Sequence, residues 1–227
     1  MIINLGDAPF KAYITVTYPK GDCTVSNGTT VLSHSGGGTH TFTVNKKGTW
    51  TVTAQYSTAV KTASVEITYR GQVENVALDY TLLLYNVGTN YVSWAKCGVG
   101  DSGYFNAPVS PSYSFGSNYM EIYQTSSTKY ASGFVYTEGK IDLTPYTKLK
   151  AVVSSVTMGK SASQMAFEIH SSFGSYVADG RLASSSIIQD SGGTFTIDLS
   201  SIKTTAYVCI RAYWGIGARI TNMQLEV

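Results

Sequence analysis

Hydrophobic and polar residues alternate along much of this chain with the period of two that is typical of β-strands. The alternation is clearest in the stretch AYVCIRAYWG at residues 206–215. One face of this predicted strand is apolar and is expected in the core: Ala206, Val208, Ile210 and Ala212. The other face carries larger or more polar side chains: Tyr207, Cys209, Arg211 and Tyr213. The pattern therefore predicts one buried face, and the second is either a solvated strand surface or a surface that stacks on a ligand.

Residues 11–80 contain several short runs of the same kind, separated by turn residues. Asn27-Gly28 lies between two β-prone runs and predicts a hairpin, because a type I′ turn needs positive φ at both central positions. A second turn is expected at residues 45–48, and Trp50 follows it as a single inward-facing tryptophan. Strands at a spacing of about 8–12 residues around one inward Trp suggest a small immunoglobulin-like β-sandwich.

The composition changes near residue 80, from a Thr/Val-rich stretch to one dense in Tyr, Phe, Ser and Gly. We therefore expect two modules, residues 1–80 and residues 81–227. About eight strands and no helical pattern can be read in the second module, which fits a jelly-roll sandwich. The predicted fold class is all-β, with an immunoglobulin-like sandwich followed by a jelly-roll sandwich.

Three predicted strands of the second module have polar faces from which a binding site could be built. Their candidate ligand-binding residues are Tyr119, Glu121 and Tyr123 in the first strand, Gln164, Glu168 and His170 in the second, and Arg211, Tyr213 and Trp214 in and after the third. If these strands are neighbours in one sheet, the side chains form a concave surface. Aromatic rings stack on the C–H faces of a pyranose, and Arg, Glu or Gln groups bond adjacent hydroxyls in pairs.

A structural interpretation of the same residues stays open. Tyrosine is favoured on exposed strand faces because it forms cross-strand pairs there, without any ligand. Trp214 could stack on a ligand at a loop edge or cap the end of the sandwich core. Sequence does not give the strand order, so it does not decide whether these side chains meet.

Composition and charge exclude several classes of protein. Charged residues make up only 13% of the 227 residues, which leaves few for the wet faces of amphipathic helices. The formal net charge is +2 and the Lys and Arg residues form no run, so no nucleic-acid partner is expected. No apolar run approaches the roughly 20 residues of a membrane span, and the N-terminal segment lacks the pattern of a secretory signal.

Motifs for catalysis or cofactor binding are not found. The three cysteines are far apart and form no CxxC pair, which predicts free, buried thiols. No HExxH or GxSxG motif occurs, and His34 and His40, which flank a glycine-rich stretch, are expected to be exposed loop residues. A glycosidase would need two carboxylates about 5–10 Å apart, and solvated strand-face carboxylates are the default. We therefore expect no catalytic residues and no cofactor, with a structural Ca²⁺ held by acidic side chains and loop carbonyls as an alternative.

Two sets of sequence stretches carry a resemblance to known proteins. With ITVTYPKGDCTVSNGTTVL and THTFTVNKKGTWTVTA, the first module resembles the small immunoglobulin-like modules of phage tail and minor structural proteins of gut Firmicutes. With GKIDLTPYTKLKAVV, GTFTIDLSSIKTTAYVCIRAYW and ITNMQLEV, the second is similar to the jelly-roll domains that follow such modules. The pattern DLTPYTKLK is also similar to carbohydrate-binding modules.

This resemblance implies a non-enzymatic, phage- or prophage-encoded tail-associated protein that is assembled in the bacterial cytoplasm and located in the virion. Its expected partners are a host cell-surface glycan or receptor, bound through the second module, and other tail proteins, with a homo-oligomer as a further expectation. Two alternatives remain. One is a purely structural virion or surface-adhesin protein, and the other is a glycoside hydrolase or its accessory fragment.

Overall fold

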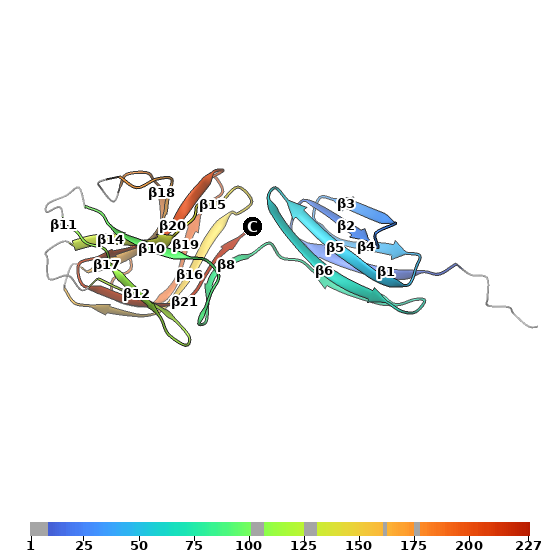
Figure 1. The fold of residues 1–227 in the computed structure, drawn as a ribbon, viewed down its shortest axis with the longest axis horizontal. Helices are drawn as coiled ribbons and strands as arrows, with labels where there is room; N and C mark the ends of the chain where they lie inside the picture. The colour runs from blue at the N-terminus through green and yellow to red at the C-terminus, as the bar shows by residue number, and fades with distance from the viewer. Residues whose placement is uncertain (1–8, 101–106, 125–130, 161–162, 175–177) are drawn as a thin grey trace, which may run out of the picture. The chain divides into compact units, whose positions relative to one another are not determined.

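The structure is a computed structural model, and it describes five stretches of the chain: residues 9–100, 107–124, 131–160, 163–174 and 178–227. Strands β1 to β21 lie in these stretches, which contain no helix, so the predicted all-β class is confirmed. No helix able to cross a membrane is therefore found in the described residues. The chain divides into two compact units, Met1–Tyr80 and Thr81–Val227, and each is described by itself (Figure 1).

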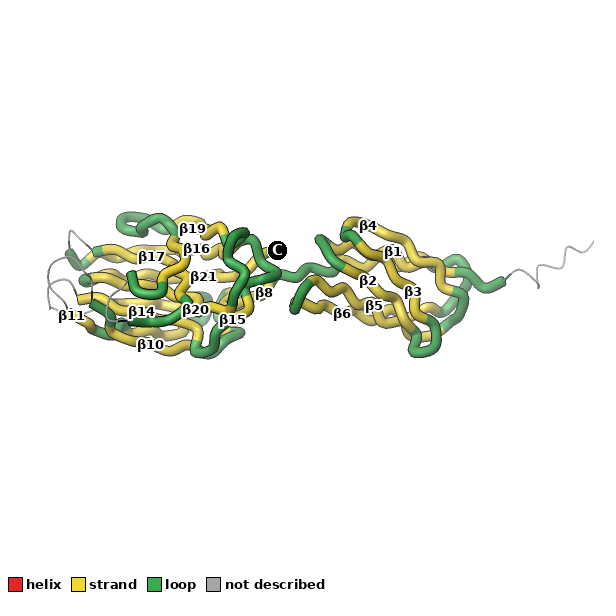
Figure 2. The backbone as a smooth tube through the Cα atoms, turned by 90° about the horizontal axis from the view of Figure 1, so that it is seen from above, coloured by secondary structure: helices red, strands yellow, loops and turns green. Residues whose placement is uncertain are grey.

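The first unit consists of two sheets (Figure 2). One sheet has the strand order β4-β1-β7, with the bounds β1 Ala12–Tyr18, β4 Gly38–Val44 and β7 Val73–Ala77. The other has the order β3-β2-β5-β6, with the bounds β2 Asp22–Ser26, β3 Val31–Ser35, β5 Gly48–Tyr56 and β6 Ala59–Ile67. β1 and β7 pair in parallel, and the other pairs are antiparallel. The alternating apolar residues of both sheets face each other and form the core, with Trp50 fully buried among them as expected.

The β2–β3 hairpin forms at the predicted place but with a longer loop. The loop spans residues 27–30, and Gly28 has a φ of 87°. Asn27 Oδ1 accepts hydrogen bonds from the backbone N–H of Thr29 (3.1 Å) and of Thr30 (2.8 Å). The asparagine side chain thus replaces part of the backbone pairing that a two-residue type I′ turn would make.

His34 and His40 correct another expectation, because they lie on strands and not in an exposed loop. β3 continues to Ser35 and β4 begins at Gly38, so the loop between them is only residues 36–37. The two imidazole rings are stacked, with centroids 4.0 Å apart, and His34 Nδ1 lies 2.7 Å from the Tyr18 hydroxyl oxygen. Gly36, Gly37 and Gly38 all have positive φ, which lets the chain reverse this tightly and brings the histidines together.

The second unit also has two sheets, and we name each by a central strand. The β20 sheet has the order β10-β14-β20-β17-β18, with β11 beside β14 and β15 beside β20. Its strands are β10 Trp94–Gly98, β11 Ala107–Pro108, β14 Ala131–Thr137, β15 Ile141–Asp142, β17 Gln164–His170, β18 Arg181–Ser184 and β20 Thr205–Tyr213. The β21 sheet has the order β12-β13-β21-β16-β19, with β8 beside β21 and β9 beside β8. Its strands are β8 Leu82–Asn86, β9 Thr89–Asn90, β12 Ser112–Phe115, β13 Met120–Tyr123, β16 Lys148–Met158, β19 Gly193–Asp198 and β21 Ile216–Glu226.

The main core of the second unit is built from the apolar faces of both sheets. It includes the face predicted from the alternation in β20: Ala206, Val208, Ile210 and Ala212, all fully buried. β21 contributes Ile220 and Met223 from the opposite side. Each sheet therefore has an inner face that packs in this core and an outer face that points away from it.

The chain passes from β20 to β21, and so from one sheet to the other, in a two-residue turn. Trp214 and Gly215 form this turn with φ values of 38° and 82°. The Trp214 backbone N–H donates to the Ala131 carbonyl (2.8 Å), and its carbonyl accepts from Ser163 Oγ (2.6 Å). These two bonds hold a non-glycine residue in the left-handed region, which it would otherwise avoid.

Candidate functional site

The three strands expected to share one polar surface lie in different sheets. β17 and β20 are neighbours, with Gln164 opposite Tyr213 and His170 opposite Tyr207. β13 pairs with β21 in the other sheet, so Glu121 and Tyr123 lie on the far side of the core. One surface from all three strands required them to be neighbours in one sheet, and this condition is not met. The sequence left it open because strand order depends on long-range pairing, which the local alternation does not contain.

The outer face of the β20 sheet is covered by the protein itself. Cys209, Phe134 and Val99 form a second, smaller apolar cluster on this side. Phe173, in the segment after β17, packs against that cluster, and its ring centroid lies 4.9 Å from that of Tyr207 in a stacked arrangement. The sequence did not decide whether this face contacts solvent or a ligand. In the structure, the face largely forms an additional apolar core.

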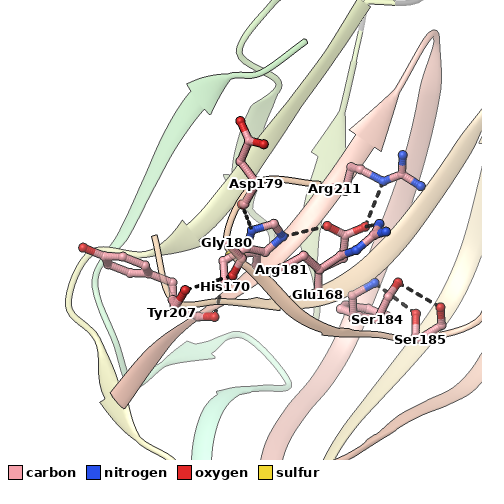
Figure 3. A network of polar contacts seen from close by, with 12 residues as sticks. Glu168, His170, Asp179, Gly180, Arg181, Ser184, Ser185, Tyr207 and Arg211 are labelled. Carbon is pink, nitrogen blue, oxygen red and sulfur yellow. Dashed lines mark hydrogen bonds and ion pairs between the residues drawn. The ribbon is translucent and has the colours of Figure 1, made fainter. Parts of the chain in front are cut away.

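A charged network lies on this covered face (Figure 3). The Glu168 carboxylate is fully buried, with Oε2 2.8 Å from His170 Nε2 and Oε1 3.1 Å from Arg211 Nε. Arg181 Nη1 lies 3.5 Å from the same Oε1. A buried carboxylate costs several kcal/mol of desolvation, and the guanidinium groups of Arg211 and Arg181 beside it offset part of that cost.

Both ring nitrogens of His170 have a polar partner in this network. Its Nδ1 lies 3.2 Å from the Asp179 carbonyl oxygen, which can only accept a hydrogen bond. Its Nε2 faces the Glu168 carboxylate, which is an acceptor when ionised. His170 therefore bridges the carboxylate to the segment that covers the sheet.

The network ties three neighbouring strands together, because Glu168 and His170 belong to β17, Arg181 to β18 and Arg211 to β20. Three of the side chains that the sequence suggested for a ligand, Glu168, His170 and Arg211, thus contact one another and are removed from the surface. Sequence analysis did not find Arg181, since nothing in the local pattern places it beside residues of β17. We call this arrangement a structural clamp, meaning a network of polar contacts that holds neighbouring strands together.

The remaining candidates on this side are not gathered into a site either. Tyr213 is 7% exposed, and Gln164, opposite it, is half-buried. Trp214 is half-buried in the turn to β21.

The cysteines are free, with Cys23 and Cys209 buried as expected and Cys97 half-buried.

The outer face of the β21 sheet is hollowed into an open groove of about 600 Å³. Its lining residues come from β13, β16 and β21: Glu121, Tyr123, Ser155, Thr157, Gly217, Ala218 and Arg219. The register arranges the outward side chains in two rows across the three strands. These rows are Glu121–Arg219–Ser155 and Tyr123–Gly217–Thr157.

Gly217 forms the floor of the groove. It lies between Tyr123 and Thr157, which are two strand spacings or about 10 Å apart in backbone position. A Cβ added at Gly217 would lie 3.8 Å from Thr157 Cβ, in ordinary van der Waals contact. The glycine therefore leaves space that a larger residue could occupy without steric conflict.

A charged pair lies at one end of the groove and stays accessible to solvent. Arg219 Nε donates to Glu121 Oε1 (3.0 Å), and the two side chains are 45% and 34% exposed. The Arg219 guanidinium carbon lies 4.3 Å from the centre of the Tyr119 ring. A Cβ added at Gly116 would come within 2.7 Å of Tyr119 Cζ, so this ring lies directly on the glycine. Tyr119 is thus held between Gly116 and Arg219 and supports the pair.

Two of the predicted residues, Glu121 and Tyr123, line the groove, and Tyr119 lies next to it. The sequence analysis missed Arg219 and Gly217, which both belong to β21. An arginine on the polar face of that strand could have been named as a candidate from the alternation alone. The alternation does not show that this arginine pairs with Glu121. The groove combines an aromatic ring, two hydroxyls, a carboxylate and a guanidinium, which are hydrogen-bonding and stacking groups for a polar ligand.

No group of three or more His, Cys, Asp or Glu side chains suited to a metal ion occurs in the described ranges. The alternative of a structural Ca²⁺ also involved loop carbonyls as ligands, and this finding does not test it.

Comparisons with known proteins add little to this geometry. No protein-family model and no curated protein sequence matches the chain. Among solved structures, it is similar to the K1 cleaved adhesin domain of Lys-gingipain from Porphyromonas gingivalis W83, at 15% identity and a TM-score of 0.40, covering 65% of this chain and 98% of that one. It is also similar to a calcium-binding mutant of Bacteroides uniformis β-glucuronidase 2, at 13% identity and a TM-score of 0.22, covering 97% of this chain and 30% of that one. At these scores neither likeness carries a functional argument.

Proposed function

We propose that the second unit is a non-enzymatic glycan-binding module and that the groove on the β21 sheet is its binding site. The observation that carries this proposal is the arrangement of Tyr123, Gly217 and Thr157 across three strands, beside the exposed Glu121–Arg219 pair. A glycine floor between an aromatic side chain and a hydroxyl provides room for a sugar ring. The same groove offers hydrogen-bond donors and acceptors at its edge.

The chemistry of a sugar fits these groups. The C–H face of a pyranose can lie against an aromatic ring such as Tyr123, while its hydroxyls bond to polar side chains. Ser155 and Thr157 each provide a hydroxyl that donates and accepts, and Arg219 and Glu121 provide charge-assisted bonds. Because all these residues lie on paired strands, the site is preorganised and loses little entropy when it binds.

The charges of the groove favour binding over hydrolysis. Glycoside hydrolysis usually uses two carboxyl groups about 5–10 Å apart, one of them as the acid. Among the described residues that line the groove, Glu121 is the single carboxylate, and it is bonded to Arg219. In this pair Glu121 accepts a charge-assisted hydrogen bond from Arg219, which suits the role of an acceptor in ligand binding.

The biological setting that we propose is a phage or prophage tail, in which the module contacts glycans of the host cell surface. This part of the proposal is supported by the resemblance of the sequence stretches described above. Several copies of the module on one tail would increase the avidity of individually weak sites.

The proposal is tested with the full chain on a glycan array, comparing the wild type with Gly217→Val. The valine fills the groove floor, and it suits a strand position, so the fold is retained. We expect the wild type to bind a subset of glycans and the variant to lose about tenfold or more in affinity, equivalent to about 1.4 kcal/mol.

Thr196→Val is the matched control, because Thr196 is an exposed residue of β19 in the same sheet and does not line the groove. It should bind as the wild type does. Equal binding by folded Gly217→Val would exclude the groove as the site. If the wild type binds no glycan, the glycan-binding function itself is wrong, and a purely structural role is favoured.

A further inference from the structure

We infer that the groove selects neutral, hydroxyl-rich sugars over anionic ones, and that Glu121 sets this selectivity. The inference rests on the proposed function, since it specifies which glycans the same groove takes. It is carried by the Glu121–Arg219 pair and by the way in which Tyr119 holds it.

The charges that line the groove cancel. Among the described residues that line the groove, Arg219 is the cation, Glu121 is the anion and the others are uncharged. A sugar carboxylate that approached the guanidinium would also meet the Glu121 carboxylate, which lies 3.0 Å from Arg219 Nε. Attraction to one charge is thus offset by repulsion from the other. An anionic ligand therefore gains little interaction energy to offset the cost of its own desolvation.

A neutral sugar meets a complementary pattern at the same place. Arg219 uses Nε for Glu121, and within the described residues its terminal nitrogens and Glu121 Oε2 have no hydrogen-bond partner. The pair therefore presents N–H donors next to a carboxylate acceptor. Two adjacent hydroxyls match this arrangement, because one can accept from the guanidinium while the other donates to the carboxylate.

Tyr119 is a positioning residue for this pair. Its ring lies on Gly116 and carries the Arg219 guanidinium on it, 4.3 Å from the ring centre. A cation–π contact of this kind restrains a side chain that would otherwise sample many rotamers. The guanidinium is thereby kept beside Glu121 and is not free to turn toward an anion elsewhere in the groove.

The experiment measures the affinity of the full chain for neutral oligosaccharides and for oligosaccharides that contain uronic or sialic acid. The wild type should prefer the neutral set. Glu121→Gln leaves Arg219 without its counter-charge, so affinity for the anionic set should rise about tenfold and fall again with added salt. Affinity for the neutral set should fall a few-fold, since one strong acceptor becomes a weaker one.

Two further variants complete the design. Arg219→Gln should lose affinity for the neutral set without gaining any for the anionic set. Glu226→Gln removes the same charge from another ion pair of β21, seven residues or about 23 Å further along the strand, and should change neither affinity.

The failures of the two proposals are distinguishable. A wild type that prefers anionic glycans, or a Glu121→Gln variant with unchanged selectivity, overturns this inference even when Gly217→Val still abolishes binding. Absence of binding by the wild type to either set overturns the proposed function, and the inference falls with it. Thermal unfolding of each variant confirms that the fold is retained, as expected for an exposed pair.

Discussion

The two outer faces of the second unit have the same sequence pattern but different environments. Each combines Tyr, Glu and Arg residues on strands whose alternate residues are apolar, and each contains a Glu–Arg ion pair. On the β20 sheet, Glu168 is fully buried and Arg211 is 8% exposed. On the β21 sheet, Glu121 and Arg219 remain a third or more exposed. The comparison shows that a Glu–Arg pair is a structural clamp or an available recognition element according to what covers it.

The difference comes from the segment that packs on one face and from a glycine in a strand of the other face. After β17 the chain folds back, so that Phe173 packs against Tyr136 (centroids 4.6 Å apart) and Tyr207, and Ser171 N–H donates to the Gly180 carbonyl. On the β21 sheet, Gly217 near the start of β21 forms the floor of the open groove. The comparison can be tested by changing one face at a time.

The largest expected effect is that of Glu168→Ala on stability. This change leaves Arg211 buried without its carboxylate, and breaking a buried ion pair in this way typically costs about 3–5 kcal/mol. We expect that loss in the free energy of unfolding of the second unit, measured by denaturant titration. Glu168→Gln, which keeps the shape and some hydrogen bonds, should lose less. A loss below about 1 kcal/mol would contradict the assignment of the network as a clamp.

A smaller effect is expected for Phe173→Ala, which thins the cover over the β20 sheet. Phe173 is half-buried, so we expect the free energy of unfolding to fall by about 1–3 kcal/mol, less than for a fully buried phenylalanine.

Burial raises the pKa of the Cys209 thiol well above its ordinary value, and the nearby Glu168 charge raises that pKa further. Cys209 should therefore react slowly with a thiol reagent at pH 8 in the parent protein and faster in the variant.

This reactivity is measured with Cys23 and Cys97 replaced by alanine, so that Cys209 is the thiol observed. Phe115→Ala is a suitable control, because Phe115 is an exposed aromatic residue of β12 in the other sheet. Equal rates for the parent and Phe173→Ala would show that Phe173 does not protect the β20 face.

The smallest effect on stability is expected for Arg219→Ala. Solvent-exposed ion pairs contribute about 0–1 kcal/mol, so the free energy of unfolding should change by no more than that. Arg211→Ala, the equivalent change on the covered face, should cost several times as much because it breaks a buried pair. The two variants are compared by the same denaturant titration. Similar losses for both would remove the distinction between the covered and the open face.

Some of the candidate site could be predicted because it depends on strand geometry alone. Glu121 and Tyr123 were recognised as outward-facing from the alternation in MEIY, and both line the groove. Arg219 was not linked to them because it lies 98 residues away from Glu121 in the chain. The polar residues Glu168 and Arg211 were recognised by the same rule, but their burial under the segment after β17 was not foreseeable from it.

The sequence by itself determined the all-β class and which residues of a strand share a face, because side chains alternate with a period of two whatever the strand pairs with. It also determined that one face of β20 is core. Only the tertiary structure decided that β13 and β20 lie in different sheets, and that one polar face is covered while the other holds a groove. Those outcomes depend on pairing between distant segments and on where a connecting segment packs, and neither is encoded in a local pattern.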